Sequence, residues 1–269
     1  MAKIVSIHSF RGGTGKSNVT ANLATWIAKS GYRVGIVDTD IQSPGIHVPF
    51  KLDETQVKYT LNDYLWGRCS IDAAVYDVSA VLSTGRSWFG NRGKLYLIPS
   101  SIKTGEISRI LREGYDARSL NDGFRALIQK LQLDYLFIDT HPGINEETLL
   151  SVIISDVLVV ILRPDKQDYQ GTAVTIDVAR KLEVPKMLLV VNKALPSLNF
   201  EALRQQIQTS YQAPVAGILP VCEEMFQLAS SDIFCLRHPD HAWSKEIHAI
   251  AAQVQANQSS GSRLAYQSR

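Results

Sequence analysis

The chain has 269 residues, of which 45% are hydrophobic and 20% are charged, and its net charge is +2. The length and the hydrophobic content predict one domain with a sizeable core over residues 1–256, followed by a polar, flexible tail over residues 257–269. The net charge is too small to predict nucleic-acid binding by itself, and every apolar run is too short to span a membrane.

A glycine-rich segment follows the first apolar stretch of the chain, Ile4–Ile7. Residues 10–17 read Phe-Arg-Gly-Gly-Thr-Gly-Lys-Ser, and a helical pattern over residues 16–30 begins within them. Glycines let the backbone curl with its N–H groups inward, and such a curl at a helix N-terminus binds phosphate. We expect Lys16 to reach the outer phosphates of a nucleotide and Ser17 to ligate Mg²⁺. The nucleotide-binding residues expected here are Arg11, Gly12, Gly13, Thr14, Gly15, Lys16, Ser17 and Asn18.

Two further apolar stretches are followed by aspartate residues. Asp38 and Asp40 follow residues 34–37, and carboxylates at such a strand end can hold the water ligands of Mg²⁺ and orient an attacking water. Residues 133–139 end in Asp139 and resemble a Walker B strand, whose aspartate contacts the metal through water. We therefore expect Ser17, Asp38, Asp40 and Asp139 around one Mg²⁺.

Asn192-Lys193 ends the apolar stretch over residues 187–191. A GTPase carries Asn-Lys-x-Asp at this point, and the aspartate of that motif binds guanine. Position 195 is leucine in this chain, so the pattern favours ATP over GTP.

Short apolar runs alternate with helical patterns along the chain. The expected strands cover residues 4–7, 34–37, 95–98, 135–138, 157–162, 187–191 and 215–219, and the expected helices cover residues 16–30, 104–114, 119–131, 146–154, 170–182, 199–210 and 244–255. Continuous apolar runs are typical of strands buried on both faces of a parallel sheet. The alternation predicts an α/β fold: a doubly wound, mostly parallel sheet flanked by helices, as in P-loop NTPases. All the motifs would lie at the carboxyl edge of this sheet, where ligands bind.

The run Arg11–Ser17 resembles the deviant Walker A motif of the ParA/MinD family of ATPases. The family has lysine where this chain has Arg11, and the resemblance implies that this residue reaches across a dimer interface to the partner's phosphates. It also implies that Asp38 supports the metal, that Asp40 positions the attacking water and that Asn192 contacts adenine. Residues 218–223 resemble the family's loop that packs on the base, which adds Pro220, Val221 and Cys222 to the expected nucleotide contacts.

The resemblance implies a slow ATPase that forms a homodimer when it holds MgATP and that positions or partitions DNA or a cellular structure. Lys16, Asp40 and Arg11 are the expected catalytic residues, and a protein activator or cargo adaptor is the expected partner. Basic residues in two regions are a candidate surface for non-specific DNA: Lys103, Arg109, Arg112, Arg118, Arg125 and Lys130, and then Arg180, Lys181, Lys186 and Arg204.

Three cysteines in an unpaired pattern suit a reducing cytoplasm, with nucleoid association as a further option. The absence of a Cys-x-x-Cys pair argues against zinc, and it also argues against the iron–sulfur relatives of the family. The tail holds too little apolar area for a membrane anchor. Two other functions stay open: an ATP-dependent metabolic enzyme such as an amidoligase or a dethiobiotin-synthase-like protein, and a binding module without turnover. The roles of His141 and of Trp88-Phe89 also stay open, with His141 expected to be exposed and without a role in the site.

Overall fold

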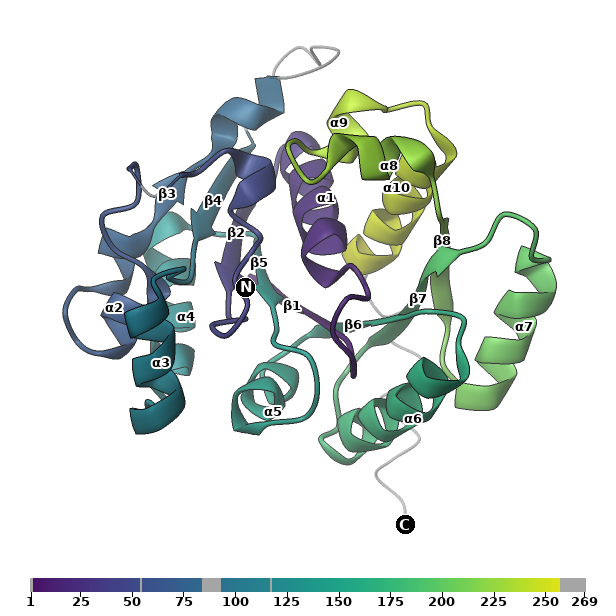
Figure 1. Ribbon diagram of the computed structural model, residues 1–269, viewed down its shortest axis with the longest axis horizontal. Coiled ribbons are helices and arrows are strands. Elements are labelled where there is room, and N and C mark those ends of the chain that lie inside the picture. The colour runs from purple at the N-terminus through teal and green to yellow at the C-terminus, as the bar shows by residue number, and fades with distance from the viewer. Residues whose placement is uncertain (1, 54, 84–92, 117, 257–269) are drawn as a thin grey trace.

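An eight-stranded sheet organises the protein in the computed structural model, which describes residues 2–53, 55–83, 93–116 and 118–256 (Figure 1). The strand order is β3-β4-β2-β5-β1-β6-β7-β8. The strands are β1 (Lys3–His8), β2 (Arg33–Asp38), β3 (Tyr76–Asp77), β4 (Lys94–Ile98), β5 (Tyr135–Asp139), β6 (Val157–Leu162), β7 (Met187–Ala194) and β8 (Val215–Pro220). The pairing is parallel except between β3 and β4. The tail and Trp88-Phe89 lie outside the described residues.

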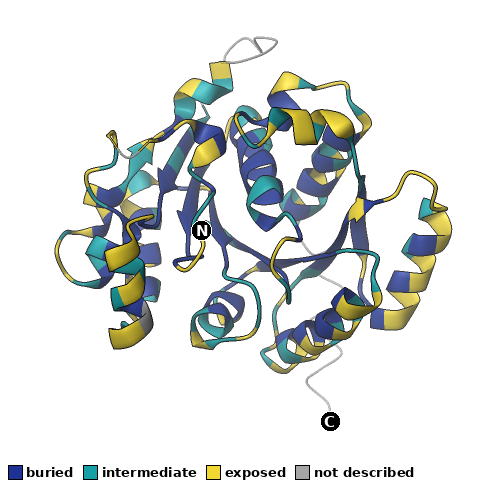
Figure 2. Ribbon diagram, in the orientation of Figure 1, coloured by how far each residue is buried: buried dark blue, intermediate teal, exposed yellow. Residues whose placement is uncertain are grey.

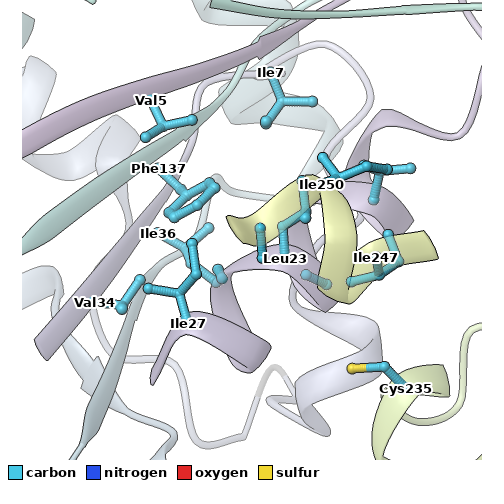
Figure 3. Packing of buried hydrophobic residues seen from close by; sticks show 14 of the residues in the cluster. Val5, Ile7, Leu23, Ile27, Val34, Ile36, Phe137, Cys235, Ile247 and Ile250 are labelled. Carbon is cyan, nitrogen blue, oxygen red and sulfur yellow. The ribbon is translucent and has the colours of Figure 1, made fainter. Parts of the chain in front are cut away.

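Helices cover both faces of the sheet. They are α1 (Lys16–Lys29), α2 (Leu61–Leu65), α3 (Thr104–Glu113), α4 (Arg118–Leu131), α5 (Glu146–Ile153), α6 (Lys166–Lys181), α7 (Phe200–Tyr211), α8 (Glu223–Leu228), α9 (Phe234–Arg237) and α10 (Ala242–Gln255). On one face α1, α9 and α10 pack against alternate residues of the central strands, among them Val5, Ile36 and Phe137 (Figure 3). On the other face α2, α4 and α5 cover one half of the sheet, and α6 and α7 cover the other half.

The central strands are buried on both faces, which is why their sequences are apolar throughout rather than alternating (Figure 2). All six residues of β6 and all five of β5 are buried. Burial of this kind exposes no side chain to water, so the hydrophobic effect favours a valine- and leucine-rich strand at the centre.

The predicted doubly wound, mostly parallel sheet is confirmed, and every expected strand is present. The expected helix over residues 170–182 begins earlier, at Lys166, because Asp165 accepts a hydrogen bond from the Asp168 amide and caps the helix there. The patterns missed β3, α8 and α9, which are too short to show a periodicity.

Parallel pairing brings the predicted motifs to one edge. Asp38 pairs directly with Asp139 at the ends of β2 and β5, and β1, which leads into the glycine-rich segment, lies between β5 and β6. The carboxylates and the glycine loop therefore meet although up to 128 residues separate Arg11 from Asp139 in the chain.

Candidate functional site

The glycine-rich segment forms a curl that opens into α1. Gly13 and Gly15 have φ angles of 73° and 93°, a left-handed region that side chains rarely occupy. Asn192 packs against the curl and donates from Nδ2 to Thr14 O at 2.7 Å, and Lys193 donates from Nζ to Gly13 O at 2.8 Å. A Cβ on Gly15 would stand only 2.5 Å from Asn192 Nδ2. The end of β7 thus holds the curl in shape from behind.

Lys16 lies among the three predicted carboxylates. It is only 6% exposed, and the charges of Asp139, Asp40 and Asp38 act on it in that order of strength. Burial lowers the pKa of Lys16, and the carboxylates oppose that change. The structure therefore brings together the predicted catalytic Lys16 and Asp40 with the predicted metal ligands.

The carboxylates differ in how many of their oxygens accept a hydrogen bond from the protein. Asp38 accepts from the amides of Asp40 (3.0 Å) and Gly45 (3.3 Å), so both of its oxygens have partners. Asp139 Oδ1 accepts from Thr20 Oγ1 at 2.9 Å, whereas Asp139 Oδ2 is buried without a hydrogen-bond partner among the described residues. An unpaired buried carboxylate oxygen costs free energy, which a bound cation or its water ligand would recover.

Burial and mutual repulsion disturb the ionisation of these groups. Burial, followed by the charges of Asp139 and Asp40, raises the pKa of Asp38 well above its usual value. Burial also raises the pKa of Asp139 to about 6, against the opposing hydrogen bonds of Ser17 and Thr20 and the charge of Lys16. The site is short of positive charge, since one ammonium faces three carboxylates.

This donor set fits Mg²⁺. Carboxylate and hydroxyl oxygens are the ligands that Mg²⁺ prefers, and they are supplied by Ser17, Asp38 and Asp139. Ser17 lowers the pKa of Asp139, so these two predicted ligands lie close to each other. A Cβ on Gly13 would meet nothing within 4 Å, so open space remains above the curl for phosphate oxygens.

The segment after β5 closes on the same site. His141 Nδ1 lies 2.7 Å from Asp40 Oδ1, and the His141 side chain is only 19% exposed. The expectation of an exposed His141 was therefore wrong, because the tertiary fold places Asp40 directly beside it. The Gly143 amide also donates to Ser9 O at 3.0 Å, which ties this segment to the start of the glycine loop.

A pocket of about 300 Å³ adjoins the glycine curl. Its predicted lining residues are Gly13, Gly15, Asn18, Asn192, Pro220, Val221 and Cys222. Sequence reasoning missed Met225, Phe226, Ala229, Ser230 and Trp243, which also line it. For Met225 and Phe226, which lie in α8, the only available signal in the sequence was that they follow Cys222 closely. The pocket is large enough for a nucleobase and stands where a phosphate chain on the curl would lead.

A sequence model of the family described as "AAA domain" matches residues 2–187. The chain belongs to this family. The match covers the glycine curl, all three carboxylates and the strands that carry them, and the sheet has the same fold as solved MinD and ParA proteins.

Two curated relatives illustrate the range of the similarity. An uncharacterized ATP-binding protein of Methanocaldococcus jannaschii is 28% identical over 94% of this chain and 88% of its own length. An iron–sulfur cluster carrier protein of Methanococcus maripaludis is also 28% identical, over 71% of this chain and 61% of its own length.

Two solved structures share the fold. The septum site-determining protein MinD of Pyrococcus horikoshii, solved with Mg-ADP, is 21% identical with a TM-score of 0.76 over 95% of this chain and 96% of that one. A ParA family ATPase of Chlorobium tepidum is 20% identical with a TM-score of 0.72 over 94% of this chain and 99% of that one.

Arg11, at the start of the glycine loop, contacts the first turn of α6. It donates to Gln167 Oε1 at the start of α6, and its Nε lies 3.9 Å from Asp168 Oδ1. Asp168 is 2% exposed and also pairs with Arg163 at 3.0 Å. Phe10 packs on the same helix, since a Cβ on Gly171 would stand 2.1 Å from its ring. The start of the loop is therefore fastened to α6.

Many of the basic residues considered for DNA are bound within the protein. Arg180 donates to Tyr211 O and Gln212 O, and Lys186 donates to Gln253 O and Ala256 O. In the other region Arg109 pairs with Glu113 at 2.7 Å and Lys130 with Asp72 at 2.6 Å. The carbonyl contacts occupy donors that a phosphate backbone would need, and the two ion pairs offset the charge of Arg109 and Lys130. Within the described residues, helices long and apolar enough to cross a membrane are absent.

Proposed function

We propose that this protein is a MgATP-dependent dimerisation switch with slow ATP hydrolysis, which positions or partitions DNA or a cellular structure. The observation that carries the proposal is the pairing of a complete phosphate site with an arginine that does not serve it. Lys16 lies buried among Asp38, Asp40 and Asp139, whereas Arg11 extends from the same loop to Asp168 on α6. An arginine so placed can act on the phosphates of a second protomer once its contacts to α6 are broken.

The residues of the site divide the work as follows. Amides of the curl and Lys16 bind the phosphate oxygens, and Asn192 holds the curl in shape from behind. Asp40 orients the attacking water and His141 holds the Asp40 carboxylate in place. Ser17, Asp38 and Asp139 would hold Mg²⁺, which would supply positive charge beside the phosphates. Arg11 of the second protomer adds a further positive charge there, as arginine fingers do.

Three variants test this mechanism. Lys16→Ala should abolish ATP binding, and retained micromolar binding would contradict the phosphate site. Asp40→Ala should accumulate as an ATP-bound dimer in analytical ultracentrifugation, because binding persists while the water is no longer oriented. Arg11→Ala should bind ATP as the wild type does but fail to dimerise or to hydrolyse; wild-type turnover in this variant would remove Arg11 from the mechanism.

The surface on which the dimer acts is the next question. Sedimentation of Asp40→Ala with plasmid DNA and with anionic liposomes, each in ATP and in ADP, separates the options. ATP-dependent sedimentation with DNA alone would identify an ATPase that binds DNA in its ATP state. Sedimentation with liposomes alone would identify one that binds membranes, and sedimentation with neither would direct the search to a protein scaffold.

A second function, an ATP-dependent enzyme acting on a small molecule, would use a pocket formed by residues 47–53, 57–63 and 99–106. The pocket holds about 50 Å³, and both charges line it: Lys58 and Lys103, and Asp53, Asp63 and Glu106, together with the hydroxyls of Thr60, Ser100 and Ser101. Ser100 donates from Oγ to Asp38 O at 2.7 Å, so the pocket adjoins the carboxylate site. Formation of ADP that depends on an added carboxylic acid would support this function over the switch.

A further inference from the structure

Three side chains with metal-binding atoms meet around Cys222, which also lines the pocket next to the glycine curl. Cys222 precedes α8, Glu224 lies in the first turn of α8, and His241 precedes α10. The Cys222 Sγ, one Glu224 carboxylate oxygen and one ring nitrogen of His241 all lie within 4.8 Å of one another. His241 Nε2 stands 3.8 Å from Glu224 Oε2.

The spacing is close to what a metal ion requires. Zinc–sulfur and zinc–nitrogen bonds of about 2.3 and 2.1 Å in a tetrahedral site place ligand atoms roughly 3.5 Å apart. The three atoms would therefore each move by about an ångström or less. Glu224 is half-exposed and can make that movement by rotating its side chain.

The surroundings favour a cation beside Cys222 and fix the imidazole. Burial and the Glu224 charge raise the pKa of the Cys222 thiol, against the opposing hydrogen bond from the Met225 amide. A cation between Cys222 and Glu224 would remove that repulsion. The His241 ring packs edge-on against the buried Phe234, with ring centroids 5.3 Å apart, so its orientation is set before a metal arrives.

We propose that Cys222, Glu224 and His241 form a binding site for a zinc-type divalent cation, with a fourth position left to water. Thiolate, imidazole and carboxylate together select Zn²⁺ and similar borderline-soft ions, whereas Mg²⁺ prefers oxygen ligands alone. The site is therefore distinct in chemistry from the oxygen site at Asp139. It would join the loop that contacts the base to the start of α10.

Binding has an identifiable cost. His241 Nδ1 accepts a hydrogen bond from the Trp243 amide at 3.1 Å, so the neutral ring carries its proton on Nε2. Coordination through Nε2 moves that proton to Nδ1 and breaks the cap of α10, and the Cys222 thiol releases its proton to solvent. One cap hydrogen bond is a small loss against three metal–ligand bonds.

Zinc titration of the untagged, nucleotide-free, chelator-treated protein tests the site. We expect one Zn²⁺ to bind with a Kd of about 10 µM or tighter, and Co²⁺ to give thiolate charge-transfer absorption. Cys222→Ser should abolish that absorption. His241→Asn should weaken zinc binding at least about tenfold while keeping α10 capped, because asparagine is a good N-cap residue.

The chain offers matched controls. Cys69→Ser removes a partly exposed cysteine and Glu223→Gln removes the neighbouring carboxylate, and both should bind zinc as the wild type does. Circular dichroism and thermal unfolding of each variant establish that it is folded. A weaker Kd for the wild type, or unchanged zinc affinity in both Cys222→Ser and His241→Asn, would overturn the assignment.

Discussion

Replacing Gly15 by alanine tests how the end of β7 supports the phosphate curl. The φ angle of Gly15 is 93°, and an added Cβ would stand 2.5 Å from Asn192 Nδ2. Asn192 would have to turn away and give up its 2.7 Å hydrogen bond to Thr14 O. Gly13 offers a matched control, since its φ is 73° but a Cβ there would meet nothing within 4 Å.

The two substitutions share a backbone cost and differ in the contact. Placing alanine in a left-handed conformation costs about 1–2 kcal/mol, which is the whole expected loss for Gly13→Ala. The lost hydrogen bond of Asn192 adds about 1–3 kcal/mol for a buried group left unpaired. Gly15→Ala should therefore lower the free energy of unfolding by about 2–5 kcal/mol, and it should weaken ATP binding because the curl opens.

Urea unfolding of both variants measures the difference. Adding Asn192→Ala removes the side chain that the Cβ would strike, so the double variant should lose less stability than the sum of the two single losses, by about 1 kcal/mol or more. Equal losses for Gly15→Ala and Gly13→Ala, or strict additivity in the double variant, would refute the argument that Asn192 supports the curl.

Three further predictions concern the carboxylates and the base pocket. The pKa of Asp139 rises from 3.8 to about 6 on folding, so the folded protein binds this proton more tightly than the unfolded chain does. The wild type should therefore lose up to about 3 kcal/mol of stability as the pH rises from about 4 to about 6. Asp139→Asn should lack this loss and should be the more stable protein in urea unfolding at pH 7.5. Asp168→Asn should lower the free energy of unfolding by about 1.5–3 kcal/mol, since the charge-assisted hydrogen bonds between Asp168 and Arg163 are lost while both arginines stay partly exposed to water. Phe226→Ala should weaken ATP binding roughly tenfold through lost stacking, yet change unfolding by less than about 0.5 kcal/mol, because the side chain is 67% exposed in the pocket wall.

Each of these has an outcome that contradicts it. An unfolding free energy of wild-type protein that rises between pH 4 and pH 6 while that of Asp139→Asn stays flat would reverse the sign of the Asp139 argument. Wild-type stability of Asp168→Asn would mean that its ion pairs are balanced by their desolvation. Unchanged ATP affinity in Phe226→Ala would place the base elsewhere.

The sequence alone was sufficient for the fold and for the edge at which the glycine loop and the carboxylates meet, because both depend on local patterns. Continuous apolar runs identify strands buried on two faces, and parallel strands bring their carboxyl ends to one edge whatever lies between them. The glycines, Lys16 and Ser17 adjoin one another in the chain, so their spacing carries the chemistry. Locating the ends of two strands was enough to place Asp38 and Asp139 at the same edge, and the register pairs them directly.

Tertiary structure decided the contacts between segments that have no common local pattern. His141 meets Asp40 across 101 positions of sequence, and Arg11 meets Gln167 across 156. Cys222 and His241 also come together only in the folded protein, because no local sequence motif links them. A side chain's partner depends on where two loops finish after the core has packed, and the packing energy of the whole sheet sets those positions. Residue type and spacing therefore predicted which groups could do chemistry, and the fold determined which of them act together.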